Sequence, residues 1–406
     1  MARRIRDNVI EVKGPAEAEE RNLAAHKKRI TIRRTAIIVA LLIVVIVIAV
    51  AYVSRHLRNY NSIKVISSAE TTYESNASYL RFGKNLLKYT SGGVSYINEK
   101  GEVVWTAGID LSMPIASVNG NYAVVADKGG NQVAVFNTDG QISTVTMPYA
   151  ICDVDVAGQG SFAAILESDT TNYINMYSSS GEIIYEIQTS IDKSGYPMDI
   201  SVSDNGQKLF TSYFKLDGVN INNNLTANNF GEVGQNENAD RMVGGYTFEE
   251  EMIPKVQFVS NNVVVAFSDT KIHVYNMKEK PSEKAEIDYN GDISGIFYSS
   301  EFVGTIMPNP DTSSSMKYVM HVYDLSGKEL FAYPFAMEYE NIYADEDEII
   351  ITGGNQCLII QKSGRTKFAY SFDSMVKSMI PTSRNNEYIV TYEGRTDTVK
   401  LRTEDK

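Results

Sequence analysis

Cysteine, histidine and tryptophan are scarce in this chain. Its 406 residues include two cysteines, four histidines and one tryptophan. Two cysteines are too few for a disulfide framework or for a zinc site built on cysteine. The sequence also contains no serine nucleophile elbow, no HExxH zinc helix and no glycine-rich phosphate loop. We therefore predict no catalytic residue, no bound metal and no cofactor.

Positive charge is scarce beyond residue 60. Residues 61–406 contain 26 lysines and arginines against 45 aspartates and glutamates. Nucleic acid requires a basic surface that neutralises its phosphates, so this composition excludes nucleic acid as a partner. Lying flat on anionic lipid is disfavoured for the same reason. The excess of negative charge fits a soluble domain whose copies repel one another.

Charge is absent from one long apolar run at residues 35–53, TAIIVALLIVVIVIAVAYV. These nineteen residues would span about 28 Å as an α-helix, close to the roughly 30 Å of a hydrocarbon core. In lipid the run must be helical, because every backbone polar group has to be satisfied within the segment. We predict a transmembrane helix at residues 35–54, with the lipid bilayer as the partner of residues 35–53. A buried core helix, the alternative, is usually shorter and carries a polar stripe.

The flanks of this run indicate its orientation. Residues 1–34 carry ten lysines and arginines, five of them in KKRITIRR (27–34). Because positive charge stays in the cytoplasm, residues 1–34 are predicted to be a disordered cytoplasmic arm. Residues 55–61 then form a juxtamembrane linker, and the rest of this single-pass cell-membrane protein is extracytoplasmic. A signal peptide cleaved near AVA (49–51) is the alternative, although the run exceeds the usual length of about 7–15 residues.

One phrase recurs along the exported part: a short alternating strand, a polar turn with glycine, and a second strand. It occurs as VSYINEKGEVVW (94–105), VAVFNTDGQIST (133–144), INMYSSSGEIIY (174–185), MHVYDLSGKELF (320–331) and CLIIQKSGRTKF (357–368). Glycine supplies the positive φ that a hairpin turn needs. Four residues after each glycine stands a fixed position, usually aromatic, where neighbouring repeats are expected to pack.

The repeat predicts an all-β, eight-bladed β-propeller after the transmembrane helix. Three spacings between the glycines are 39, 41 and 37 residues, and two further strands precede most phrases, which fits four-stranded blades. The last repeat, 376–402, supplies only three strands. We expect the spare strand at 62–68 to complete it, so that residues 62–406 form a propeller closed by its two ends. Seven blades with 62–90 as an irregular stalk is the alternative.

The GEVVW at 101–105 resembles the tryptophan-docking pattern of quinoprotein-type eight-bladed propellers. Non-enzymatic propellers that scaffold assembly in bacterial envelopes share this pattern. Quinoprotein dehydrogenases repeat the tryptophan in blade after blade, whereas this chain has one. The basic arm, the single helix, the WD40-like repeats and the stretch FGEVGQNENADRMVGG (230–245) resemble an uncharacterised clostridial family of membrane-anchored propellers. That resemblance implies an architecture and no activity.

The cysteines and the two exported histidines are expected to be structural. Cys152 falls in the third blade and Cys357 in the seventh, on opposite sides of a ring, so a disulfide between them is not expected. His273 and His321 occupy equivalent positions of their repeats, IHVY and MHVY. Equivalent positions in neighbouring blades are separated by the rotation between those blades, so the histidines are not expected to share a metal.

Three aspartates are candidates for a site in the central channel. Asp153 and Asp155 of ICDVDV point to one face of a predicted first strand, and Asp199 belongs to the first strand of the next blade. Such carboxylates would bind a cation or act on envelope polysaccharide only if they converge on one pocket. Pairing with lysine or arginine would argue against an enzyme, and a hydrated polar channel mouth is the alternative.

The fourth repeat contains an unusually long segment, residues 215–245, rich in asparagine and glycine. We predict a long loop here, and such loops often carry function. Asn228, Asn229, Phe230 and Arg241 are the candidate ligand surface, because amides pair well with carbohydrate hydroxyls. An outer-strand excursion without a ligand is the alternative.

A binding or scaffold role fits these features best. The propeller would be displayed outside the membrane to hold an envelope protein or a cell-wall glycan. One alternative is an envelope polysaccharide-active enzyme that uses the channel carboxylates, and a second is a transmembrane sensor that signals through the cytoplasmic arm.

Overall fold

The chain divides into two compact units, Met1–Arg58 and Asn59–Lys406. The computed structural model describes residues 23, 26–28, 33–48, 58–72, 74, 76–169, 171–192, 194–218, 220–238, 240–289 and 291–404. In the first unit, the helix His26–Ile48 has 23 residues and a mean hydropathy of 2.5. It is long and apolar enough to cross a membrane, either as an anchor or as a signal sequence. It begins before the predicted start, and residues 49–54 of the predicted span lie outside the described residues.

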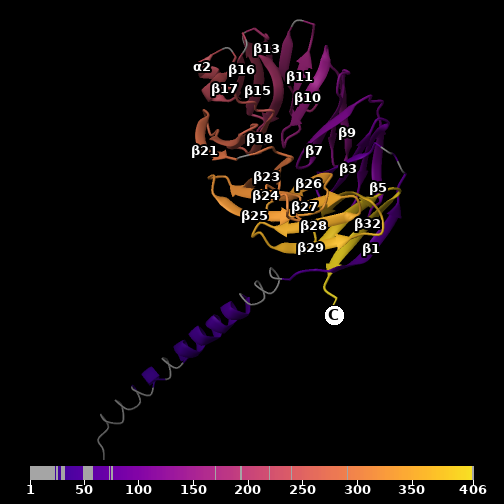
Figure 1. Cartoon of the computed structure of the whole chain (residues 1–406), viewed down its shortest axis with the longest axis vertical. Helices are drawn as coiled ribbons and strands as arrows, with labels where there is room; N and C mark the ends of the chain where they lie inside the picture. The colour runs from indigo at the N-terminus through magenta and orange to yellow at the C-terminus, as the bar shows by residue number, and fades with distance from the viewer. Residues whose placement is uncertain are drawn as a thin grey trace, which may run out of the picture. The chain divides into compact units, whose positions relative to one another are not determined.

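The second unit is an eight-bladed β-propeller, which confirms the predicted fold class. Each blade is a four-stranded antiparallel sheet, and in blades 1 to 7 its strands follow one another in chain order from the innermost to the outermost (Figure 1). Blades 1 to 4 comprise β2 Ser78–Phe82, β3 Asn85–Thr90, β4 Gly93–Ile97 and β5 Val103–Gly108; β6 Pro114–Asn119, β7 Tyr122–Asp127, β8 Gln132–Asn137 and β9 Gly140–Thr146; β10 Ala150–Val156, β11 Phe162–Glu167, β12 Asn172–Tyr177 and β13 Ile183–Thr189; and β14 Tyr196–Val202, β15 Lys208–Asp217, β16 Asn220–Asn229 and β17 Met242–Glu249. Blades 5 to 7 comprise β18 Lys255–Ser260, β19 Val263–Phe267, β20 Lys271–Asn276 and β21 Ser282–Asp288; β22 Gly295–Tyr298, β23 Phe302–Pro308, β24 Tyr318–Asp324 and β25 Glu329–Phe335; and β26 Asn341–Ala344, β27 Glu348–Gly353, β28 Gln356–Gln361 and β29 Thr366–Ser371.

Blade 8 joins the two ends of the domain. Its order is β1-β32-β31-β30, with β30 Val376–Pro381 innermost, then β31 Glu387–Tyr392, β32 Arg395–Arg402 and β1 Ser62–Glu70. The strand β1 runs antiparallel to β32, from Ser62 opposite Arg402 to Glu70 opposite Arg395. The spare strand of the sequence is therefore the outer strand of the last blade, and it covers an edge that would otherwise be open.

The core lies between the blades, because each middle strand is covered on both faces. Val124 and Val125 of β7 point to opposite faces, yet both are fully buried. Outermost strands behave differently: exposed and half-buried residues alternate along β5, since one of its faces meets solvent. This explains why middle strands are continuous apolar runs and outer strands are mixed.

Trp105 and the hairpin glycines connect neighbouring blades. The Trp105 ring stacks on Tyr96 of its own blade and on Phe136 of blade 2, with ring centroids 5.4 and 5.5 Å apart. Its indole N–H donates to the Thr138 carbonyl oxygen at 3.1 Å. The turn glycine Gly181 of blade 3 lies against Val145 in the outer strand of blade 2. The repeated phrase therefore encodes contacts between blades as well as a turn.

Replacing Gly181 by alanine should destabilise the domain more than the same change at Gly120. Gly181 has a φ of +88°, and an added Cβ would lie 2.3 Å from Val145 Cγ2, whereas Gly120 has a φ of +56° and open space around it. We expect Gly181→Ala to cost about 3 kcal/mol and Gly120→Ala about 1–2 kcal/mol. Denaturant unfolding of both variants measures the difference, and equal midpoints would contradict the contact.

The long segment of blade 4 is ordered secondary structure and not the predicted loop. It extends the hairpin of β15 and β16 to ten residues per strand, and then forms the short helix α2 Glu232–Glu237 before β17. The asparagine-rich sequence forms a strand here because buried asparagines are satisfied. Asn223 is fully buried, and both the amide and the oxygen of its side chain form hydrogen bonds. Its amide donates to Ser212 Oγ at 2.9 Å and its oxygen accepts from the Ile253 backbone N–H at 2.9 Å.

Candidate ligand-binding cavity

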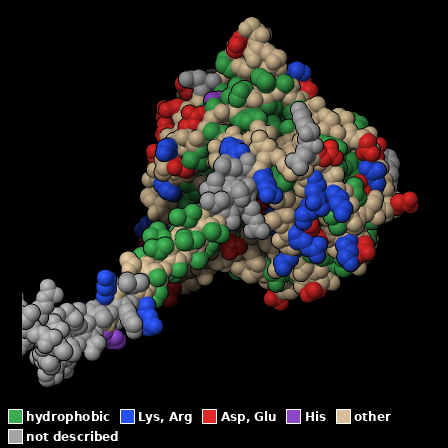
Figure 2. All heavy atoms as spheres, turned by 90° about the horizontal axis from the view of Figure 1, so that it is seen from below, with side chains coloured by type: hydrophobic (Ala, Val, Ile, Leu, Met, Phe, Trp, Pro, Cys, Tyr) green, Lys and Arg blue, Asp and Glu red, His purple; other side chains and the backbone are tan. Residues whose placement is uncertain are grey.

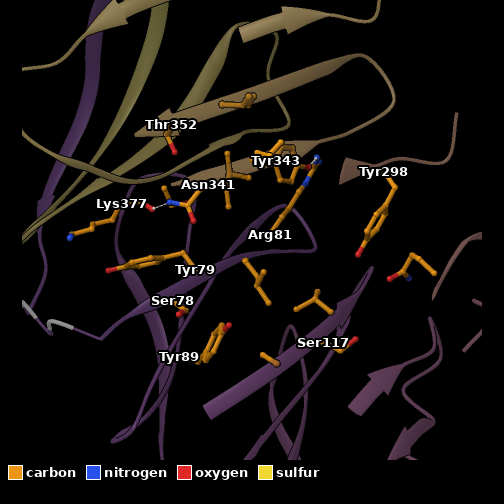
Figure 3. Close-up of a pocket in the computed structure, with 18 of the residues that line it drawn as sticks. Ser78, Tyr79, Arg81, Tyr89, Ser117, Tyr298, Asn341, Tyr343, Thr352 and Lys377 are labelled. Atoms are coloured by element: carbon orange, nitrogen blue, oxygen red, sulfur yellow. Dashed lines mark hydrogen bonds between the residues drawn. The ribbon is translucent and has the colours of Figure 1, made fainter. Parts of the chain in front are cut away.

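A cavity of about 700 Å³ occupies the centre of the ring, and all eight innermost strands contribute to its wall. Figure 3 shows Tyr79 and Arg81 of β2, Tyr298 of β22 and Tyr343 of β26 around this space. A volume of this size accommodates a small ligand or one segment of a larger one. The innermost strands of a closed ring also hold these side chains on rigid backbone.

One side of the cavity carries an acidic cluster built by β10, β14 and β18, in which Asp153, Asp155 and Lys255 line the cavity and Asp199 does not. Lys255 Nζ donates to Asp199 Oδ1 at 2.9 Å, and the Val256 backbone N–H donates to Asp199 Oδ2 at 2.7 Å. Burial raises the pKa of Asp199 to about 7; Lys255 opposes that rise and Asp153 adds to it. Burial lowers the pKa of Lys255, but Asp199 and the other nearby acidic groups outweigh it, so its pKa is raised. Lysine and aspartate therefore form an ion pair when both are charged.

Asp155 is held by hydroxyl and backbone donors. Ser117 Oγ donates to its Oδ1 at 2.7 Å, and Ser201 Oγ and the Val202 backbone N–H donate to its Oδ2 at 3.2 and 2.7 Å. Burial raises the pKa of Asp155, and the bond from Ser117 opposes that rise. Burial also raises the pKa of Asp153. The positive charge of Lys255 opposes this rise, and the negative charge of Asp155 adds to it. The cluster thus carries three carboxyl groups and one lysine.

The other side of the cavity carries cations. Arg81 donates to the Tyr343 hydroxyl at 2.9 Å and lies 3.8 Å from Asp345. Lys377 Nζ lies 3.3 Å from Glu393, and the Lys377 carbonyl oxygen accepts from the Asn341 amide at 3.3 Å (Figure 3). Acidic and basic side chains therefore lie on different innermost strands of the same cavity, whose wall also contains tyrosine and asparagine.

The structure brings Asp153, Asp155 and Asp199 to the same cluster, but only Asp153 and Asp155 line the cavity, and Asp199 is paired with Lys255. That pairing is the arrangement that argues against a polysaccharide-active enzyme, because a general acid or nucleophile must be free to meet its substrate. Across the described ranges, no group of three or more histidine, cysteine, aspartate or glutamate side chains is placed to hold a metal ion.

The candidate surface of blade 4 is occupied by contacts within the chain. The Asn228 amide donates to the Asp240 carbonyl oxygen and the Asn229 amide to that of Glu279, at 2.8 and 3.0 Å. Phe230 packs on Tyr185, and Arg241 lies over the same ring at 5.1 Å. These four residues lie on blade 4 and do not line the central cavity.

The histidines and cysteines lie apart from one another. His273 Nε2 lies 2.6 Å from Oε1 of Glu251, which precedes blade 5, and His321 Nδ1 lies 2.9 Å from Glu329 Oε1 within blade 6. Cys152 and Cys357 are both free thiols, in blades 3 and 7.

Sequence reasoning missed the partners of the aspartates and the cationic side of the cavity. Lys255, Arg81 and Lys377 belong to no chemical motif, and their roles depend on which innermost strands become neighbours. A signal was nevertheless present, because Lys255 begins the run KVQFVS and Lys377 follows the first residue of VKSMIP, both predicted strands. Charged residues on strands that line a channel are candidates for its wall.

Solved structures with the same fold include proteins of unrelated sequence. BamB from Moraxella catarrhalis is 11% identical with a TM-score of 0.53, and covers 84% of this chain with 100% of its own. Sqt1 from Saccharomyces cerevisiae is 14% identical with a TM-score of 0.55, covering 86% and 100%. Chaetomium thermophilum Sqt1, bound to the N-terminus of the ribosomal protein L10, is 9% identical with a TM-score of 0.56, covering 84% and 100%. These likenesses establish the propeller fold alone.

No curated protein matches the sequence of this chain. A family of unknown function, DUF5711, matches residues 56–401, which is the whole propeller apart from its last few residues. The match agrees with the resemblance to an uncharacterised propeller family. The chain is a member of the DUF5711 family.

Proposed function

We propose that this chain is a membrane-anchored, extracytoplasmic binding module that holds an envelope protein or a cell-wall glycan in its central cavity. The observation that carries the proposal is the cavity wall, where Lys255 is paired with Asp199 and Asp155 is bonded to serine hydroxyls and a backbone N–H group. Charges fixed in this way orient a ligand without reacting with it. The tyrosines Tyr79, Tyr298 and Tyr343 add apolar area and hydroxyl groups to the same wall.

The helix supports the location of this module. An uncleaved helix at His26–Ile48 with ten basic residues in 1–34 would retain the N-terminus in the cytoplasm and export the propeller. A rigid ring displayed in this way suits a scaffold, as no moving part is required to form the cavity. Sqt1 bound to a protein N-terminus is consistent with a propeller that accepts a peptide.

Photo-crosslinking in the native cells tests the proposal. A benzoylphenylalanine in place of Tyr79 lies in the cavity wall, and one in place of Lys284 lies exposed on the outer strand β21. We expect ultraviolet light to attach an envelope protein or glycan to the Tyr79 variant at least about tenfold more than to the Lys284 variant. Equal or absent adducts at both positions would contradict a ligand in the cavity.

A further inference from the structure

Blade 8 carries a patch of positive charge on a domain that is otherwise acidic. The patch, here called the closing-blade patch, consists of Lys64 on β1, Lys400 and Arg402 on β32, Arg384 between β30 and β31, and Lys100 in the adjacent hairpin of blade 1. Figure 2 views the molecule from the side on which β1 and β32 lie in Figure 1, and it shows lysine and arginine side chains gathered there. An acidic domain that concentrates cations on one face has a local anion-binding surface.

The pairing of β1 and β32 places these cations together. Lys64 is directly opposite Lys400, and Ser62 is directly opposite Arg402. Residues two apart on a strand share a face, so Lys64, Lys400 and Arg402 all lie on one face of the sheet. Like charges directly opposite each other destabilise a strand pair, and an external anion would relieve that repulsion.

The nearby carboxylates do not neutralise the patch. Glu387 lies 2.8 Å from Lys400 and 3.5 Å from Arg384, so one carboxylate serves two cations. Glu99 accepts a hydrogen bond from the Ser383 backbone N–H at 2.6 Å. Within the described part of the chain, Lys64, Lys100 and Arg402 form no salt bridge. These three cations face solvent and are available to a partner.

A hollow of about 380 Å³ adjoins the patch. Its wall includes Ile66 and Ser67 of β1, with Lys100 and Arg384 at its sides. Ser67 Oγ is buried and has no hydrogen-bond partner, and Ile66 is 45% exposed. The cations and the exposed apolar side chain together fit a phosphate group that is joined to an apolar body.

The length of the chain limits how far this patch can lie from a membrane. The predicted span ends at residue 54, and the Tyr60 backbone N–H already donates to the Lys367 carbonyl oxygen in blade 7 at 2.9 Å. Six residues reach at most about 20 Å even when fully extended. A span that ends at residue 54 would therefore limit how far the start of β1 can lie from the bilayer.

We propose that the closing-blade patch binds the phosphate headgroups of anionic lipids in the membrane that anchors the chain. This inference rests on the proposed membrane anchor and specifies which face of the propeller meets the bilayer. The excess of carboxylates elsewhere repels the same lipids, so the patch selects one orientation out of many. In that orientation the cavity is presented in a fixed direction.

Lysine acetylation of the full-length chain in nanodiscs tests the proposal. One set of discs contains phosphatidylcholine alone and the other contains 30 mol% phosphatidylglycerol. We expect acetylation of Lys64 and Lys100 to be slower by about fivefold or more in the anionic discs. Lys284 and Lys328, exposed in blades 5 and 6, serve as controls within the same molecule and should react equally in both.

Charge-reversal variants sharpen the test. The double variant Lys64→Glu with Arg402→Glu should lose the protection of Lys100, whereas Lys284→Glu with Lys328→Glu should retain it. Equal acetylation of Lys64 in both kinds of disc would overturn the lipid contact while leaving the cavity proposal standing. Protection by polyphosphate in phosphatidylcholine discs as strong as that by phosphatidylglycerol would also overturn it, because the patch would then be a site for soluble anions. A chain that does not enter discs at all would overturn the anchor and this inference together.

Discussion

A chain that begins at residue 75 should lose most of the folding stability of one that begins at residue 59, because it lacks β1. This strand pairs with β32 through eight residue positions, and Ile63 packs against the core between blades 7 and 8. Asp397, only 3% exposed, would also lose the hydrogen bond that it accepts from Ser68 at 2.6 Å. Backbone bonds worth about 1 kcal/mol each and one half-buried isoleucine worth up to about 2 kcal/mol give a loss of roughly 5–10 kcal/mol. That equals the whole stability of many domains.

Denaturant unfolding followed by tryptophan fluorescence measures this loss. Trp105 is the single tryptophan, and it reports the contact between blades 1 and 2. Ile63→Asp in the full-length chain should reproduce part of the loss, about 2 kcal/mol, and Val65→Asp, at a position that is 48% exposed, should cost less. If the chain that begins at residue 75 unfolds at the same denaturant concentration and with the same steepness as the longer one, β1 does not close the ring.

The ring could be predicted from sequence because its determinants are local. A glycine turn and a fixed packing position recur in most repeats, and each repeat needs its neighbours to bury its faces. The role of β1 could be predicted by counting the strands in each repeat, because the last repeat has three strands and needs a fourth. Blade 4 was misjudged because its β16 uses buried asparagines such as Asn223, whose partners Ser212 and Ile253 lie on other elements. Low strand propensity was overridden by tertiary hydrogen bonds that no local pattern records.

The candidate site could be predicted only in part, for a related reason. Asp153, Asp155 and Asp199 lie on innermost strands, which the repeat identifies. The pairing of Asp199 with Lys255 depends on the side-by-side placement of β14 and β18, which belong to consecutive blades. Arg81 and Tyr343 come from blades 1 and 7 and meet only because the ring closes.

Replacing Lys255 by methionine should give the largest effect of any change in the cavity, and the effect should depend on pH. Three carboxyl groups would then share a buried cluster without their lysine. Leaving buried charge uncompensated costs about 3–5 kcal/mol, which we expect at pH 8. At pH 5 the loss should be smaller, because protonation removes part of that negative charge. Unfolding midpoints at both pH values measure this, with the exposed Lys284→Met as the control.

Asp199 determines the direction of the pH dependence in the unmodified protein. Its pKa is about 7 when folded, against an ordinary value of 3.8, so between pH 4 and pH 7 the folded state holds a proton that the unfolded state has released. The contribution of this group is therefore a gain in stability as the pH falls through 7, and a loss of at most about 4 kcal/mol as the pH rises from 4 to 7. Asp199→Asn should flatten this dependence relative to the unmodified chain, and Asn in place of the exposed Asp292 should not. An unchanged pH dependence in Asp199→Asn would mean that the carboxyl is ionised throughout, with Lys255 compensating fully for its burial. In that case Lys255 would line the cavity in a permanent ion pair with Asp199, and ligand binding would not be coupled to a proton near neutral pH.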